Sequence, residues 1–201
     1  MDHDIEEVLS ELKSLDEGLH GKCLETLDAQ RLSQLLDTIT GTLNGNSNLN
    51  NHEKFGRIIW NLSLAILLKF PNSLNWTLAT RLSECFSGVN MDVSGQHSLF
   101  RIDIIREATI ASKSLPDIPK AFATLLIAMV SQKYLTINDL ESHALALLHF
   151  EWAKEELIFI EKCLTDIKAM ILAKLANEAE LQLILDWIAE TVAAMVADME
   201  A

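Results

Sequence analysis

The chain has 201 residues, 49% of them hydrophobic, and a formal net charge of −13 at pH 7. This length can bury a sizeable core without disulfide bonds or metal, and the apolar content excludes a disordered chain. The negative charge argues against nucleic acid and anionic membrane as partners, because each phosphate contact requires a cation. With 7 glycines and 3 prolines, the chain has too few turn formers for a sandwich or barrel. We predict one all-α domain over residues 1–201.

The cysteines and the amino terminus predict where the protein resides. Cys23, Cys85 and Cys163 match neither a disulfide framework nor a zinc spacing, so we predict buried free thiols in a reducing compartment. The first seven residues are acidic, unlike a secretory or mitochondrial signal. The longest apolar stretch, Ile58 to Phe70, is shorter than the roughly 20 residues that cross a bilayer. We therefore expect a cytoplasmic protein without membrane insertion.

The first quarter of the chain has the apolar spacing of two helices. Apolar residues separated by three and four positions form a narrow stripe before Gly18 and again after Gly21. We predict an antiparallel helical hairpin over residues 1–43. The stretch from Gly41 to His52 is rich in turn formers, so we place a mobile loop over residues 44–52.

Two segments in the middle of the chain, Phe55–Phe70 and Phe122–Val130, are apolar nearly all round. This pattern is typical of helices that other helices surround, so we predict that they form the core. We expect Ser73 to cap a following helix, Ser98 to begin another, and Asp117-Ile-Pro119 to open the next.

The last third of the chain contains no glycine or proline. Thr136 and Asp139 have the spacing of a capping box, which predicts a helix start. A single helix from there to the end would be about 98 Å long at 1.5 Å per residue, which is several times the diameter of a compact domain. It must therefore break, and the whole chain should form a bundle of about nine helices. The three that we predict here cover residues 137–149, 152–176 and 178–199.

Charge is distributed unevenly along the chain. Residues 1–52 have a net charge of −7, residues 53–135 of +3 and residues 136–201 of −9. The acidic side chains are thus concentrated in the predicted hairpin and in the last three helices.

No residue combination has the pattern of an active site or a metal centre. His143 and His149 are six positions apart, which places them about 240° apart on a helix, whereas a metal pair requires three or four positions. Glu155 and Glu156 are adjacent, point about 100° apart, and are interpreted as solvated surface. We predict no catalytic residues, no metal and no cofactor, and hence a protein that is not an enzyme.

The last predicted helix has two apolar sides. We expect the larger side to pack on the domain; its members are Leu181, Ile184, Leu185, Ile188, Val192, Met195, Val196 and Met199. The other side has Leu183, Trp187 and Ala194, bordered by Glu180 and Glu190. An exposed tryptophan with a charged rim is typical of a protein-binding hot spot. The alternative is a terminal helix that is buried on both sides.

These observations favour a non-catalytic adaptor or chaperone-like subunit that binds a basic or amphipathic segment of another protein. Its composition is similar to that of chaperones and adaptors of bacterial secretion systems, although no motif carries that similarity. A self-assembling, HEAT-like helical scaffold is one alternative, and an enzyme whose site assembles from distant residues is another. We do not expect a small-molecule ligand.

Overall fold

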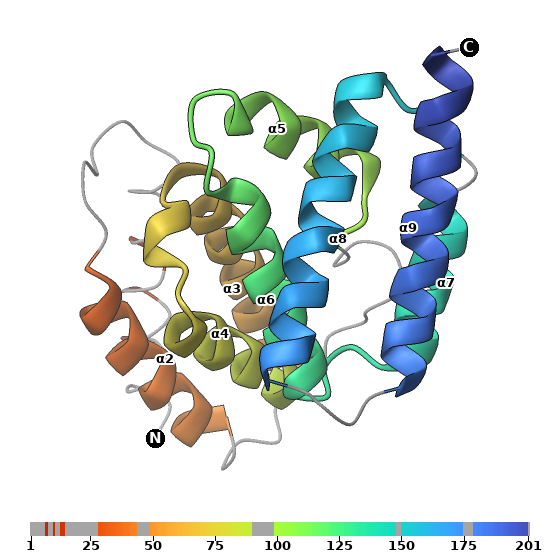
Figure 1. Ribbon diagram of the computed structural model, residues 1–201. Coiled ribbons are helices and arrows are strands. Elements are labelled where there is room, and N and C mark those ends of the chain that lie inside the picture. Colours follow the sequence, from red (N-terminus) through yellow and green to blue (C-terminus); the bar gives the residue numbers. More distant parts are fainter. Residues whose placement is uncertain are drawn as a thin grey trace.

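The computed structural model describes residues 7, 10, 13, 14, 28–43, 49–89, 99–147, 150–174 and 179–200, and over them it is an all-helical bundle (Figure 1). The predicted fold class is therefore confirmed. The predicted hairpin is described only in its second helix, because most of residues 1–27 lie outside the described part. The elements are α2 (Ala29–Leu43), α3 (Leu49–Lys69), η1 (Pro71–Ser73), α4 (Trp76–Val89), α5 (Ile102–Ser112), α6 (Ile118–Ser131), α7 (Ile137–Leu147), α8 (Lys154–Lys174) and α9 (Ala179–Glu200).

Helix α6 is the centre of the bundle. Every residue from Ile118 to Val130 is buried except Lys120, as the apolar composition of this segment predicts. Helices α3, α4, α5 and α8 all pack against it, and α8 covers it most extensively (Figure 1). Phe122 makes edge-to-face contacts with Phe100 and with Phe159 of α8, each with ring centroids 6.0 Å apart. Such contacts join helices that are far apart in the sequence.

Helix α3 supplies the second part of the core. Phe55, Ile59, Leu62 and Ile66 are completely inaccessible to solvent, which confirms the prediction for this segment. Among the described helices, none is both long and apolar enough to span a membrane.

Two helix starts follow the predicted capping chemistry. Pro119 is in the first turn of α6, where its missing N–H costs no hydrogen bond. Before α7, the backbone N–H of Thr136 donates to Asp139 Oδ2 at 2.8 Å, and the backbone N–H of Asp139 donates to Thr136 Oγ1 at 3.2 Å. This is the predicted capping box with aspartate in place of glutamate.

Three predicted boundaries are wrong. Ser73 belongs to the 3₁₀ turn η1, and it is Asn75 that caps α4, because its Oδ1 accepts the backbone N–H of Leu78 at 2.9 Å. Helix α5 begins at Ile102, not at Ser98. The predicted loop over residues 44–52 is too long, since α3 begins at Leu49, and its remainder, residues 44–48, lies outside the described residues.

The interpretation of Glu156 as solvated surface is also wrong. Glu155 is exposed, but Glu156 is buried between α5 and α8. Its Oε1 accepts a hydrogen bond from Arg106 Nε at 3.0 Å, and its Oε2 accepts one from the backbone N–H of Ala153 at 2.9 Å. The carboxylate thus caps the first turn of α8 and holds α5 to it.

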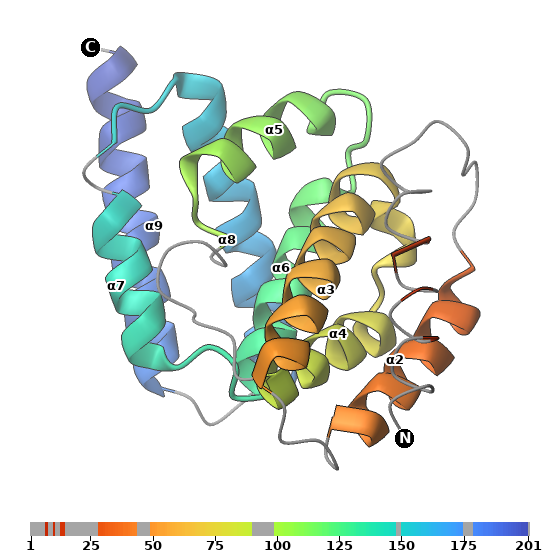
Figure 2. The same ribbon diagram turned by 180° about the vertical axis from the view of Figure 1, so that it is seen from behind.

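Helices α7, α8 and α9 form the carboxyl-terminal edge of the bundle. Their bounds agree with the predicted ranges to within two residues. Helix α9 runs antiparallel to α8 and lies beside α7 at the outside of the molecule (Figure 2). Among the described elements, it packs mainly on α8 and also contacts α7.

One ion pair fixes α9 to α8. Lys168 Nζ lies 2.5 Å from Asp186 Oδ1, and Gln182 Nε2 donates to the same oxygen at 3.1 Å. The hydrogen bonds from Lys168 and Gln182 hold the pKa of Asp186 below its ordinary value of 3.8. A carboxylate with a lowered pKa stabilises the fold when it is ionised.

Asp186→Asn should lower the free energy of unfolding at neutral pH, and the difference from the wild type should vanish as the pH falls below 3.8 and through the lowered pKa of the folded state. The sign follows because the wild-type carboxylate becomes protonated over that range and loses its charge. Urea unfolding across this pH range measures the difference, with Asp198→Asn on the same helix as control. A deficit that persists undiminished at acidic pH would exclude an electrostatic role.

The two described cysteines, Cys85 and Cys163, are buried free thiols. Burial raises the pKa of Cys85 to about 11 and that of Cys163 well above its usual value. Alkylation at mildly alkaline pH should therefore leave both unmodified in the native protein, whereas the denatured, unreduced chain should have 3 reactive thiols. Mass spectrometry counts the labels. Only one reactive thiol in the denatured chain would show a disulfide bond.

Candidate protein-binding surface

Helix α9 packs on the bundle through one side. Leu185, Ile188 and Val192 are at most 4% exposed, and Met195 and Val196 pack partly against the core. The expectation that Met199 is buried with them is wrong: it is 49% exposed, because it lies in the last turn. The Leu181 and Ile184 side chains lie outside the described part of the structure.

The opposite side of α9 is open to solvent. Leu183 is 69% exposed, Trp187 is 38% exposed, and Ala194 is also exposed. We call these three residues the outer stripe. Their separations of four and seven positions place them on one face of the helix. The alternative of a terminal helix buried on both sides is therefore wrong, since this side of α9 is exposed.

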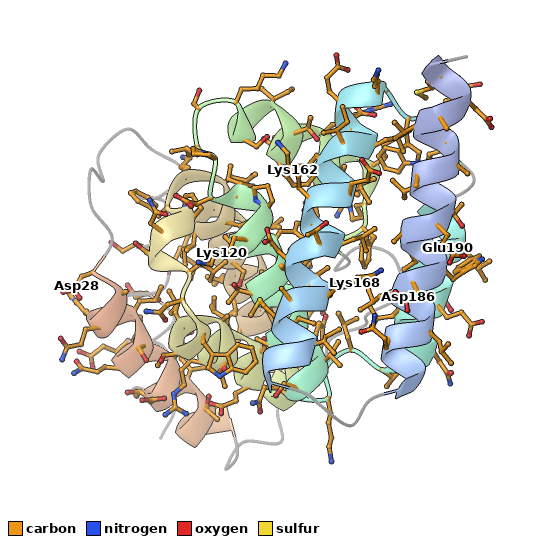
Figure 3. The ribbon with its side chains drawn as sticks, viewed as in Figure 1. Asp28, Lys120, Lys162, Lys168, Asp186 and Glu190 are labelled. Atoms are coloured by element: carbon orange, nitrogen blue, oxygen red, sulfur yellow. The ribbon has the colours of Figure 1, made fainter. Side chains whose placement is uncertain are left out.

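The acidic residues of α9 lie in two different settings. Asp186 faces α8 and pairs with Lys168, whereas Glu190 lies at the outer edge of α9 (Figure 3). Glu190 is exposed, and the described residues offer it no ion pair. It follows Trp187 by three positions, so the two share a face. The Glu180 side chain, also predicted for this surface, lies outside the described residues.

The charge around the outer stripe has one sign. Helix α9 contains no lysine or arginine between Ala179 and Glu200. Glu190 and Asp198 are both exposed and add to the negative potential, while Asp186 is largely neutralised by its lysine. An approaching chain therefore meets a large aromatic side chain beside unpaired carboxylates.

Other exposed apolar side chains lie in the same third of the chain. Leu145 on α7 is 47% exposed, and Phe150, which precedes α8, is 40% exposed and contacts Trp152 edge-to-face. Neither residue was predicted from the sequence. Leu145 lies on a short helix, and Phe150 precedes the start of α8, so neither belongs to a long apolar stripe. Among the described side chains, Ile110 on α5, at 68% exposed, is the one large exposed hydrophobic residue elsewhere. Exposed apolar side chains and acidic charge thus coincide on α7 and α9, whereas α8 has as many lysines as acidic residues.

The bundle also has a cavity of about 310 Å³ between η1, α4, α6 and α8. The side chains that line it include no histidine and no cysteine, and its only titratable residues are Asp117 and Lys120. No group of three or more His, Cys, Asp or Glu residues that could hold a metal ion occurs in the described part of the chain. The cavity therefore brings together one carboxylate and one ammonium, and no histidine lies in its lining.

Comparison with known proteins matches no family model, no curated protein and no solved structure at a significant level.

Proposed function

We propose that the protein is a non-catalytic adaptor or chaperone-like subunit that binds a basic, amphipathic helix of another protein along the outer stripe. The observation that carries this proposal is the exposure of Leu183 and Trp187 on a terminal helix whose other side is packed. A tryptophan buries a large area at little entropic cost and is therefore a frequent anchor in protein interfaces.

The spacing and charge of the surface support this choice of partner. A stripe at four and seven positions matches the side-chain spacing of a second helix lying along α9. Glu190 and Asp198 favour lysine or arginine beside the apolar residues of that helix. The apolar contacts supply most of the affinity, and the carboxylates orient the partner and raise the association rate.

Self-assembly through the same surface is disfavoured. Two copies of α9 in contact would bring carboxylates together without any lysine or arginine from either helix. A partner of opposite charge avoids this repulsion, which is why we favour an adaptor over a scaffold. The composition suits a cytoplasmic chaperone or adaptor of a bacterial secretion system.

Trp187→Ala should weaken the complex by roughly 2 kcal/mol or more and leave most of the fold intact, because the indole is exposed on α9. Wild type and variant serve as baits in affinity purification from source cells, and titration then measures each partner's affinity. Ile110→Ala is the matched control, since it removes an exposed apolar side chain from α5.

Ile188→Ala should mainly lower the stability of the fold, whereas Trp187→Ala should mainly lower partner affinity. The reason is that Ile188 is buried, so its truncation opens a cavity under α9 that costs about 2–5 kcal/mol of stability. Suppose that Trp187→Ala lowers the melting temperature as much as Ile188→Ala and retains every partner. The tryptophan would then be a packing residue, and the proposal would fail.

Glu190→Lys should slow association with a basic partner and flatten the dependence of the rate on salt, because rim charges act mainly on encounter. Stopped-flow or surface-based kinetics at several ionic strengths measure both effects. Glu107→Lys on α5 changes the net charge equally and is exposed, so it separates local from global charge. Equal effects of the two variants would argue against a partner site at α9.

A further inference from the structure

The cavity between η1, α4, α6 and α8 has an apolar floor. Pro71, Leu74, Ala121 and Thr124 are buried there, and Met170 of α8 closes one side. The Thr124 hydroxyl has no proton left for a ligand, because it donates to the backbone oxygen of Lys120 at 2.8 Å. Trp76, at the start of α4, forms a partly buried wall. A volume of about 310 Å³ lies at the lower end of the usual range for small-molecule sites.

The rim of the cavity is polar and carries both signs of charge. Asp117 and Lys120 lie three positions apart at the start of α6, and both are exposed. Residues at this spacing on a helix can pair, yet no ion pair joins these two side chains or engages either with another described residue. Asn72 and Asn75 add two exposed carboxamides from the η1 side.

The position of Lys120 keeps its ammonium available. Figure 3 shows Lys120 on α6 beside the segment that carries η1. Burial raises the pKa of Asp166 on α8, and the charge of Lys120 partly opposes this shift. The ammonium is therefore within electrostatic reach of Asp166 but not in an ion pair with it. It retains its capacity to donate to a bound anion.

We propose that this cavity binds a small zwitterion with an apolar body, such as a free amino acid with an aromatic or large aliphatic side chain. The ligand's ammonium binds Asp117, its carboxylate binds Lys120, and its side chain occupies the floor between Trp76 and Met170. A ligand with only one charge would form one charged contact instead of two and would place that charge near the rim group of like sign. This inference is independent of the partner-binding proposal, because no residue of α9 lines the cavity.

The test uses three probes of similar shape: L-phenylalanine, phenethylamine, which lacks the carboxylate, and 3-phenylpropanoate, which lacks the ammonium. Nuclear magnetic resonance of the full chain follows the indole N–H of Trp76, with Trp60, Trp152 and Trp187 as internal controls. L-Phenylalanine should shift the Trp76 signal in a saturable manner. Each analogue should bind about tenfold more weakly, since it forfeits a charged hydrogen bond.

Two variants separate recognition from folding. Asp117→Asn should weaken L-phenylalanine binding about tenfold and not weaken 3-phenylpropanoate binding. The fold should be retained, because the Asp117 side chain makes no capping hydrogen bond to α6. Lys120→Met should weaken L-phenylalanine and spare phenethylamine. Lys162→Met on α8, outside the cavity lining, should change nothing. An unmoved Trp76 signal at millimolar L-phenylalanine, or equal loss of all three probes in both variants, would overturn the proposal.

Discussion

The burial of α6 on all sides is the constraint from which the rest of the architecture follows. A helix with apolar residues around its whole circumference is stable only when other helices cover each side. Helices α3, α4, α5 and α8 do so, and α2 and α9 pack in turn on α4 and α8. Helix α9 then packs on α8 and α7 from outside the central layer, and within the described part of the chain its opposite side is exposed at Leu183, Trp187 and Ala194. The exposed outer stripe is a consequence of this second-layer position.

The same constraint accounts for the cavity. Lys120 is the one charged residue within the buried run of α6, and its ammonium cannot enter the core without a desolvation cost. The helices that cover α6 therefore leave a gap beside its first turn. At this gap the chain forms the short turn η1 and the start of α4 and not one continuous helix. An opening over buried apolar atoms, edged by Lys120 and Asp117, results. The binding properties that we infer arise where the packing of the core is interrupted.

The sequence predicted the elements whose signals are local. The capping box at Thr136, the proline of α6 and the two sides of α9 each depend on residues within a few positions of one another. The sequence-based predictions were wrong where residues far apart in the sequence determine the local structure. Glutamate is usually a surface residue, but Glu156 is buried, and Arg106, fifty positions earlier in the sequence, donates a hydrogen bond to it. Asn75 replaces Ser73 as a cap because a 3₁₀ turn intervenes. The cavity assembles from four elements, so no spacing could have revealed it.

Helix α8 connects the two candidate sites. Met170 borders the cavity, and Lys168, two positions earlier, points to Asp186 on α9 (Figure 3). Coupling between the sites would require α8 to adopt two arrangements. Its contact with α6, which includes the Phe122–Phe159 ring pair, and the cap from Glu156 fix it along its length. Moving α8 would expose core residues such as Ile160 and Ile167, at a cost of several kcal/mol. A small ligand in the cavity would have to bind the moved arrangement of α8 more tightly than the present one by at least that amount, which its few contacts do not allow. The two surfaces should therefore bind independently of each other.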